Sequence, residues 1–247
     1  MSLKWAINGV LDDIYFYAQG IPRLFIAWKP DNKLSILDFF ETNVKKFPDE
    51  VAFIFNDQKI TWKEADDKIS AYGAYLQQQG IKPGDCFALL MDNCPDFLML
   101  LLAAHRIGAI AALINTTVTG EGLKHVVTIV DAKAIILGAS HLEKFNSSMP
   151  ESELKSLNIY LVEDSFVIPN GYVDINEASK DSKDVEPHKL KIKDVAMYIY
   201  TSGTTGLPKA ALITNGRAVK TSYAGQFFGF RAKQKDILYL TLTLYHA

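Results

Sequence analysis

The chain has 247 residues, of which 49% are hydrophobic and 22% charged, a composition typical of a soluble globular protein with one large domain or two small ones. The formal net charge of −2 provides no electrostatic basis for nucleic-acid binding. The two cysteines, Cys86 and Cys94, indicate neither a disulfide framework nor a metal-binding spacing, which favours a reducing, intracellular compartment.

Residues 1–33 form an N-terminal segment with many aromatic side chains. Charged residues interrupt it, so the apolar core of a signal peptide is not expected. Two interpretations stay open for this segment: a helix that lies on a membrane surface, or an amphipathic helix that packs on the domain. The aromatic residues concerned are Trp5, Tyr15, Phe16, Tyr17, Phe25 and Trp28.

The next stretch predicts two helices with a hairpin between them. Ser35 is expected to cap a helix that stops near Pro48. Thr61 and Glu64 have the spacing of a capping box, and the helix that they open is expected to end at Gly80. The hairpin strands are expected at residues 51–55 and 59–61, on either side of Asn56-Asp57-Gln58.

From residue 86 onward, strand and helix patterns alternate. The expected strands cover residues 86–91, 110–114, 134–137, 159–162 and 195–200; the expected helices begin near Pro95 and cover residues 119–131 and 140–145. This order predicts an α/β fold with a layered, mostly parallel sheet and flanking helices. The apolar stretch 97–114 is interrupted by His105 and Arg106, and it is shorter than the about 20 residues that a membrane-spanning helix needs.

The polar residues 163–194 are expected to form a loose connection within a single domain that covers residues 34–247. Thr214 is predicted to cap a helix that runs to Phe228. Residues 236–244 are apolar at nearly every position, which predicts a central strand that is buried on both faces.

The stretch from Thr201 to Lys209 carries the clearest functional signal. Glycines allow backbone N–H groups to face an anion, hydroxyls donate hydrogen bonds, and the lysine supplies a positive charge for outer phosphates. A polar turn without a ligand is the alternative, but the density of these residue types disfavours it. The spacing fits neither a Walker A loop nor a G-x-G-x-x-G dinucleotide site. The expected phosphate-binding residues are Thr201, Ser202, Gly203, Thr204, Thr205, Gly206 and Lys209.

The same stretch resembles the phosphate loop of adenylate-forming (AMP-binding) enzymes, which include acyl-CoA synthetases, luciferases and amino-acid adenylation domains. The flanking Tyr198-Ile199-Tyr200 and Ala210-Ala211 are similar to the very-long-chain acyl-CoA synthetase and fatty acid transport protein branch. Residues 81–93 and 238–247 resemble that branch as well. The resemblance extends from about Leu34 to Ala247 and implies the N-terminal half of the family's large domain.

The resemblance implies an ATP-dependent long- or very-long-chain fatty acid–CoA ligase. In such enzymes a fatty carboxylate attacks the α-phosphate of ATP, pyrophosphate leaves, and the thiol of coenzyme A then takes the acyl group from the acyl-adenylate. By matching position, residues 201–206 would surround the β- and γ-phosphates, and Lys209 would be the catalytic residue that neutralises them.

Tyr245 and His246 match an aromatic–histidine pair near the family's acyl and adenylate pocket. A histidine that merely ends a strand is the alternative for His246. Thr243 stands where the family usually has a proline, which leaves the local turn open. The other four histidines lack ligand spacing and are expected on helix or loop surfaces; they are His105, His125, His141 and His188.

Members of the family are longer, and their ribose aspartate, magnesium ligand and C-terminal adenylation lysine would lie beyond residue 247. Mg²⁺ is therefore expected to have its ligands outside this chain, and the chain is expected to be an N-terminal fragment or a truncated product. The resemblance implies a location at the endoplasmic reticulum, the peroxisome or the plasma membrane. Another carboxylate-adenylating enzyme and a non-catalytic binding or membrane-associated relative remain open, as do acyl chain length and oligomeric state.

Overall fold

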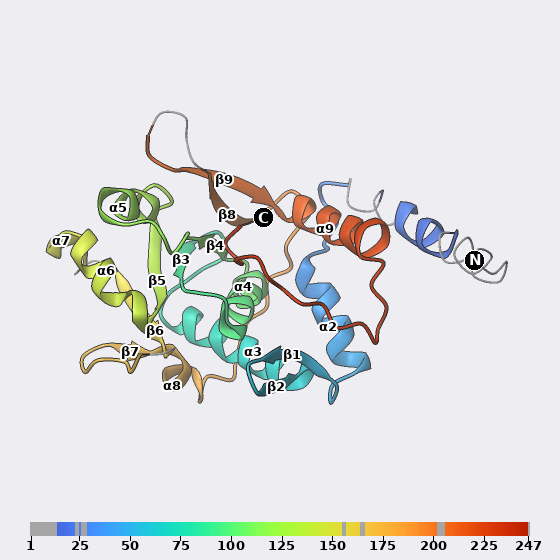
Figure 1. Ribbon diagram of the computed structural model, residues 1–247, viewed down its shortest axis with the longest axis horizontal. Helices are drawn as coiled ribbons and strands as arrows, with labels where there is room; N and C mark the ends of the chain where they lie inside the picture. Colours follow the sequence, from blue (N-terminus) through green and yellow to red (C-terminus); the bar gives the residue numbers. More distant parts are fainter. Residues whose placement is uncertain are drawn as a thin grey trace.

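The computed structural model describes residues 14–22, 25, 29–154, 157–163, 166–201 and 206–246. The core of the fold is a seven-stranded sheet with the order β7-β6-β5-β3-β4-β8-β9 (Figure 1). All neighbouring strands are parallel except β8 and β9, which confirms the predicted mostly parallel α/β sheet. The strands are β3 (Cys86–Leu90), β4 (Ile110–Leu113), β5 (Ala132–Gly138), β6 (Asn158–Val162), β7 (Val173–Asp174), β8 (Val195–Thr201) and β9 (Lys209–Thr214).

The central strand β3 divides its side chains between two hydrophobic cores. Phe87 and Leu89 point into the core that is shared with α2, α3 and α4. Ala88 and Leu90 point into the core on the other face, with α5 and α6. Because successive side chains of a strand point to opposite faces, a strand that is covered on both sides must be apolar at every position.

The first face of the sheet is covered by α2 (Ile36–Lys46), α3 (Trp62–Gln78) and α4 (Pro95–Ile107). The predicted capping box is present, since the Thr61 hydroxyl accepts a hydrogen bond from the Glu64 N–H at 3.2 Å. The predicted hairpin is confirmed as the antiparallel pair β1 (Val51–Phe55) and β2 (Gln58–Thr61).

The second face is covered by α5 (Gly120–Thr128) and α6 (Leu142–Ser148), with the short α7 (Glu151–Leu154) behind them. The connection over residues 163–194 also contributes to the sheet, because it contains β7 and the short helix α8 (Ile175–Ser179). Ile175 is fully buried. Elements of two and five residues are too short to show a periodic pattern, so the sequence did not indicate them.

After the sheet, α9 (Asn215–Ala224) continues into a π-helical turn, η2 (Gly225–Gly229). Thr214 caps α9 as predicted, since its hydroxyl accepts a hydrogen bond from the Arg217 N–H at 3.2 Å. Helical residues 14–22 lie against this end of the chain, with the Phe16 ring 6.3 Å from that of Phe227. No helix in the described parts of the chain is long and apolar enough to cross a membrane.

His105 differs from the sequence-based expectation of a surface position. It lies in α4, is only 1% exposed, and neither ring nitrogen has a hydrogen-bond partner among the described residues. The reason is that α4 is covered on all sides, by the sheet and by α2 and α3. The neighbouring Arg106 is buried too, but it pairs with Asp66 at 2.6 Å. Burial lowers the pKa of His105 to about 4.

The predicted strand over residues 236–244 is wrong for the described structure. These residues form no ladder with any described strand, and their large side chains from Ile237 to Leu242 are exposed, with Ile237 at 81% and Tyr239 at 90%. The apolar pattern specifies a strand that needs neighbours on both sides, and no described strand pairs with this segment.

We expect the buried, neutral His105 to make the fold sensitive to acid. Because its pKa is depressed in the folded state, the unfolded chain binds a proton near pH 6.5 that the folded chain binds only near pH 4. Stability is therefore lost as pH falls through this window, by up to roughly 3 kcal/mol at 1.36 kcal/mol per pKa unit. In urea unfolding at a series of pH values, His105→Leu should flatten this part of the profile.

We also expect residues 236–247 to limit the solubility of the 247-residue chain. An exposed segment that has apolar side chains and an unpaired backbone is a template for aggregation. Replacing Ile237, Leu238 and Tyr239 by serine should raise the soluble fraction and lower the fluorescence of an apolar-surface dye. The matched control is Gln234→Ser with Lys235→Ser. A sharp, cooperative melt and monomeric behaviour of the unaltered chain would contradict this expectation.

Candidate functional site

The predicted phosphate loop connects two antiparallel strands. Thr201, the last residue of β8, lies directly opposite Lys209, the first residue of β9. Residues at opposite positions of a ladder place their side chains on the same face of the sheet, so the Thr201 hydroxyl and the Lys209 ammonium lie on the same face. Both side chains are exposed. Ser202, Gly203, Thr204 and Thr205 lie outside the described residues.

Gly206 shows why the loop requires a glycine. Its φ of +120° lies in the region that L side chains rarely adopt, and no described residue lies within 4 Å of the position that a Cβ would take. The conformation, and not crowding, therefore excludes other residues at this position.

Helix α5 supports the loop through two hydrogen bonds that the sequence did not reveal. The Tyr200 hydroxyl donates to the Val126 carbonyl, and burial raises the pKa of Tyr200 well above its usual range, so it remains a neutral donor. His125 Nε2 lies 3.1 Å from the Pro208 carbonyl, directly before Lys209. These contacts hold the end of β8 and the start of β9 against the same helix.

Tyr245 and His246 lie in a turn that follows the exposed segment. Tyr245 is 6% exposed and belongs to the hydrophobic core that β3 shares with α2, α3 and α4. Its ring centroid is 5.0 Å from that of the exposed His246. Its hydroxyl lies 3.5 Å from the hydroxyl of Thr116. The His246 N–H donates to the Thr243 carbonyl at 3.1 Å, so the turn closes although Thr243 replaces the usual proline.

Thr201 and the Tyr245–His246 turn lie at the carboxyl ends of neighbouring parallel strands, whose arrangement is shown in Figure 1. Asn93 follows β3, Thr116 follows β4, and Thr201 ends β8; these three strands are mutually parallel, so their carboxyl ends meet at one edge. Ligands of open α/β sheets bind outside the carboxyl ends of the strands. The topology therefore places Thr201 and the Tyr245–His246 turn at the carboxyl ends of the strands.

A polar cluster lies at the same edge, next to β3 and β5. His141 Nε2 is 3.2 Å from Asp92 Oδ2, and Lys144 Nζ is 3.3 Å from His141 Nδ1. Lys144 also donates to the Thr116 carbonyl, and burial lowers its pKa. Within the described ranges, no group of three or more His, Cys, Asp or Glu side chains is placed to hold a metal ion.

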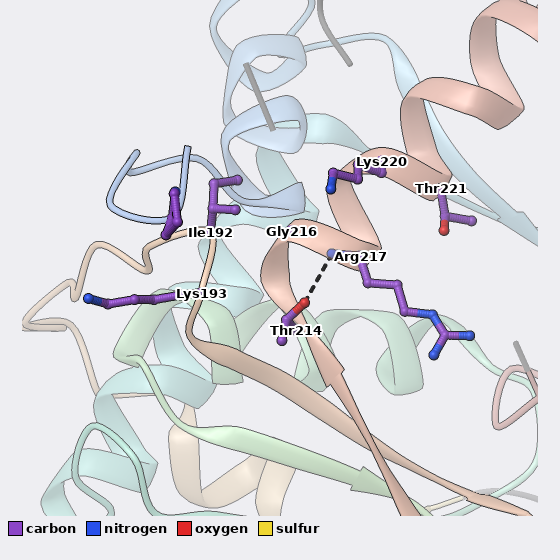
Figure 2. A pocket seen from close by; sticks show the side chains of 8 residues that line it. Ile192, Lys193, Thr214, Gly216, Arg217, Lys220 and Thr221 are labelled. Atoms are coloured by element: carbon purple, nitrogen blue, oxygen red, sulfur yellow. Dashed lines mark hydrogen bonds between the residues drawn. The ribbon is translucent and has the colours of Figure 1, made fainter. Parts of the chain in front are cut away.

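Figure 2 shows a second basic region, a pocket at the start of α9. Its Lys193 and Arg217 side chains extend away from each other, and Lys193 pairs with Asp31 at 2.8 Å. Thr214, which also lines it, lies opposite Val195 at the start of β8. The pocket is therefore at the opposite end of the sheet from the phosphate loop, and its cations do not converge.

Comparison with known proteins agrees with this arrangement. Residues 40–247 match the family described as AMP-binding enzyme. The chain is 31% identical to the medium/long-chain-fatty-acid–CoA ligase FadD6 of Mycobacterium tuberculosis, over 100% of this chain and 40% of the relative. It is 31% identical to the human long-chain fatty acid transport protein 6, over 96% of this chain and 39% of the relative. The chain thus spans about two-fifths of the length of these curated relatives.

The fold is also similar to that of solved structures. A protein of Rhodopseudomonas palustris assigned to the long-chain-fatty-acid CoA ligases superposes with a TM-score of 0.76 at 20% sequence identity, over 87% of this chain and 53% of that chain. At this identity the likeness supports the fold alone. Together with the family match over most of the chain, it confirms the resemblance seen in the sequence: the chain belongs to the AMP-binding enzyme family and corresponds to the N-terminal part of its adenylate-forming domain.

Proposed function

We propose that the protein is an ATP-dependent fatty acid–CoA ligase for long- or very-long-chain substrates, and that this chain supplies the phosphate-binding part of its adenylating domain. The observation that carries the proposal is the hairpin loop between Thr201 and Lys209 at the carboxyl edge of the sheet. The relatives described as fatty acid–CoA ligases and fatty acid transport proteins support the choice of a fatty carboxylate as substrate.

In this proposal the loop binds the β- and γ-phosphates of ATP. The exposed Lys209 ammonium, which has no ion pair within the described part of the chain, would neutralise them, and the Thr201 hydroxyl on the same face would donate a hydrogen bond. Negative charge accumulates on the departing pyrophosphate as the fatty carboxylate oxygen bonds to the α-phosphorus. Donors that are already in place lower the barrier of this step, because they need no reorganisation.

Tyr245 and His246 would line the pocket for the acyl and adenylate groups. The buried Tyr245 fixes the turn, and the exposed His246 ring beside it can reach a ligand at the sheet edge. The thiol of coenzyme A would then displace AMP from the acyl-adenylate. Mg²⁺ suits the polyphosphate chemistry, and its protein ligands, like those for the ribose and coenzyme A, are proposed to come from outside this chain.

Membrane association and a link to fatty acid uptake are part of the proposal. Several relatives are described as fatty acid transport proteins. Near the N-terminus, five large apolar side chains face solvent while Phe16 packs inward, which supports a helix that contacts a membrane surface. The exposed residues are Ile14, Tyr15, Tyr17, Ile21 and Phe25.

Two other functions compete with this one. The protein could adenylate a different carboxylate, as the structurally similar anthranilate CoA ligase AuaEII does by its description. It could also be a non-catalytic relative that keeps the phosphate loop. A panel of aliphatic, aromatic and amino-acid carboxylates, scored by pyrophosphate release from the full-length protein, separates the three. Best turnover with an aromatic or amino acid would favour the first alternative, and no turnover the second.

The isolated 247-residue chain should show no ligase turnover. Catalytic residues that act as a unit are strongly non-additive, so a part of the machinery gives little of the rate. The measurement is acyl-CoA formation from fatty acid, ATP, Mg²⁺ and coenzyme A by the purified chain, with the full-length protein as positive control. Detectable acyl-CoA from the 247-residue chain would show that the catalytic set is complete within it.

Lys209→Ala in the full-length protein should slow adenylation and leave fatty acid binding nearly unchanged, because the lysine contacts phosphates and the acyl chain contacts apolar walls. A charge-assisted contact is worth about 1.5–3 kcal/mol, which corresponds to a loss of roughly tenfold to a hundredfold in rate. Lys59→Ala, an exposed lysine in the β1–β2 hairpin, is the matched control. Wild-type pyrophosphate release by Lys209→Ala at saturating ATP would remove the lysine from the mechanism.

A further inference from the structure

Asn93 lies at the carboxyl end of the central strand β3, in a short connection to α4. It lies between the end of β3 at Leu90 and the start of α4 at Pro95. Strand β3 is paired on both sides, and α4 is buried along nearly its whole length. A side chain that is attached between two such elements has little freedom to move, which suits a group that must hold another segment in place.

The Asn93 carboxamide makes two hydrogen bonds to the exposed C-terminal segment. Its Nδ2 donates to the Leu242 carbonyl at 2.8 Å, and its Oδ1 accepts from the Leu244 N–H at 2.8 Å. In a parallel ladder, one residue pairs with the carbonyl and the N–H that flank the residue opposite to it. The Asn93 side chain therefore takes the place of one strand residue opposite Thr243, although residues 236–244 form no ladder.

Asn93, Tyr245 and the partly buried Leu244 attach this segment to the rest of the described structure next to His246. Before them, the side chains of Ile237 to Leu240 are exposed. Beyond them, the Tyr245 ring enters the core and its hydroxyl lies beside Thr116. The turn that is closed by the hydrogen bond from the His246 N–H to the Thr243 carbonyl begins at Thr243, between the two residues that Asn93 binds. The carboxamide thereby holds the backbone directly before Tyr245 and His246.

We propose that Asn93 is a positioning residue for adenylation: its carboxamide clamps the backbone on both sides of Thr243 and so places His246 beside the substrate. This inference rests on the proposed function, because it assigns to His246 a role in the same reaction. Asn93 acts through the turn and does not touch the reacting atoms.

The clamp itself is tested without any activity measurement. Hydrogen–deuterium exchange of the full-length protein reports on the Leu244 amide, which Asn93 protects. Asn93→Ala should speed its exchange by about tenfold, the effect of losing one ordinary hydrogen bond. Asn93→Asp keeps an acceptor for Leu244 but sets a carboxylate against the Leu242 carbonyl. It should preserve the Leu244 amide's protection while loosening residue 242. The matched control is Asn146→Ala. The Asn146 side-chain amide donates a hydrogen bond to the Tyr172 hydroxyl on the face of the sheet that α5 and α6 cover.

The positioning role is tested by kinetics of the same variants. Asn93→Ala and Asn93→Asp should each lower kcat for pyrophosphate release by roughly tenfold, with the KM for ATP nearly unchanged, because the phosphate loop is not part of the clamp. If Asn93 acts through His246, its substitution should have little further effect in a His246→Ala background. A double-mutant cycle detects this loss of additivity, which a general loss of stability would not produce.

Each outcome decides a separate statement. Unchanged exchange at Leu244 in Asn93→Ala overturns the clamp. Faster exchange with unchanged kcat overturns the positioning role, and so do fully additive effects of Asn93 and His246. A wild-type protein that releases no pyrophosphate with any carboxylate overturns the proposed function and the positioning role with it, while the exchange result still decides whether Asn93 clamps the segment.

Discussion

The structure depends on the burial of β3 between two hydrophobic cores. Side chains from this one strand alternate between the core under α2, α3 and α4 and the core under α5 and α6. A strand in this position must pair on both sides and must be parallel to its neighbours, since helical connections return the chain to the same end. The loops that follow β3 and its parallel neighbours therefore all lie at the carboxyl ends of the strands, and the candidate site lies there.

The site follows from this constraint. Loops from β3, β4, β5 and β8 meet at the carboxyl edge and bring together residues that lie far apart in the sequence: Asn93, Thr116, His141 and Thr201. The antiparallel β9 has a separate effect. By folding back on β8, it turns the phosphate loop into a hairpin loop and sets Lys209 opposite Thr201. The Lys209 ammonium and the Thr201 hydroxyl thus lie on the same face of the sheet, although seven residues separate them in the sequence.

The departures from the sequence-based expectation share one physical cause. His105 is expected on a helix or loop surface because it lacks ligand spacing, but its helix is buried along nearly its whole length and the ring is buried without hydrogen bonds among the described residues. Residues 236–244 were expected to be a buried strand because they are apolar, but no described strand pairs with them. Local composition states what environment a segment suits; whether that environment exists is decided by the neighbours that pack there.

The sequence by itself determined the α/β class, the alternation of strands and helices from residue 86 to residue 162, the Thr61 and Thr214 caps, and the glycine- and hydroxyl-rich loop that ends in Lys209. These features rest on local preferences: side-chain periodicity, capping hydrogen bonds and backbone freedom at glycine. Only the tertiary structure decided the strand order, the pairing of Lys209 with Thr201 and the support of the loop by His125 and Tyr200. It alone revealed the Asn93 clamp, because contacts between residues separated by 149 and 151 positions leave no local pattern.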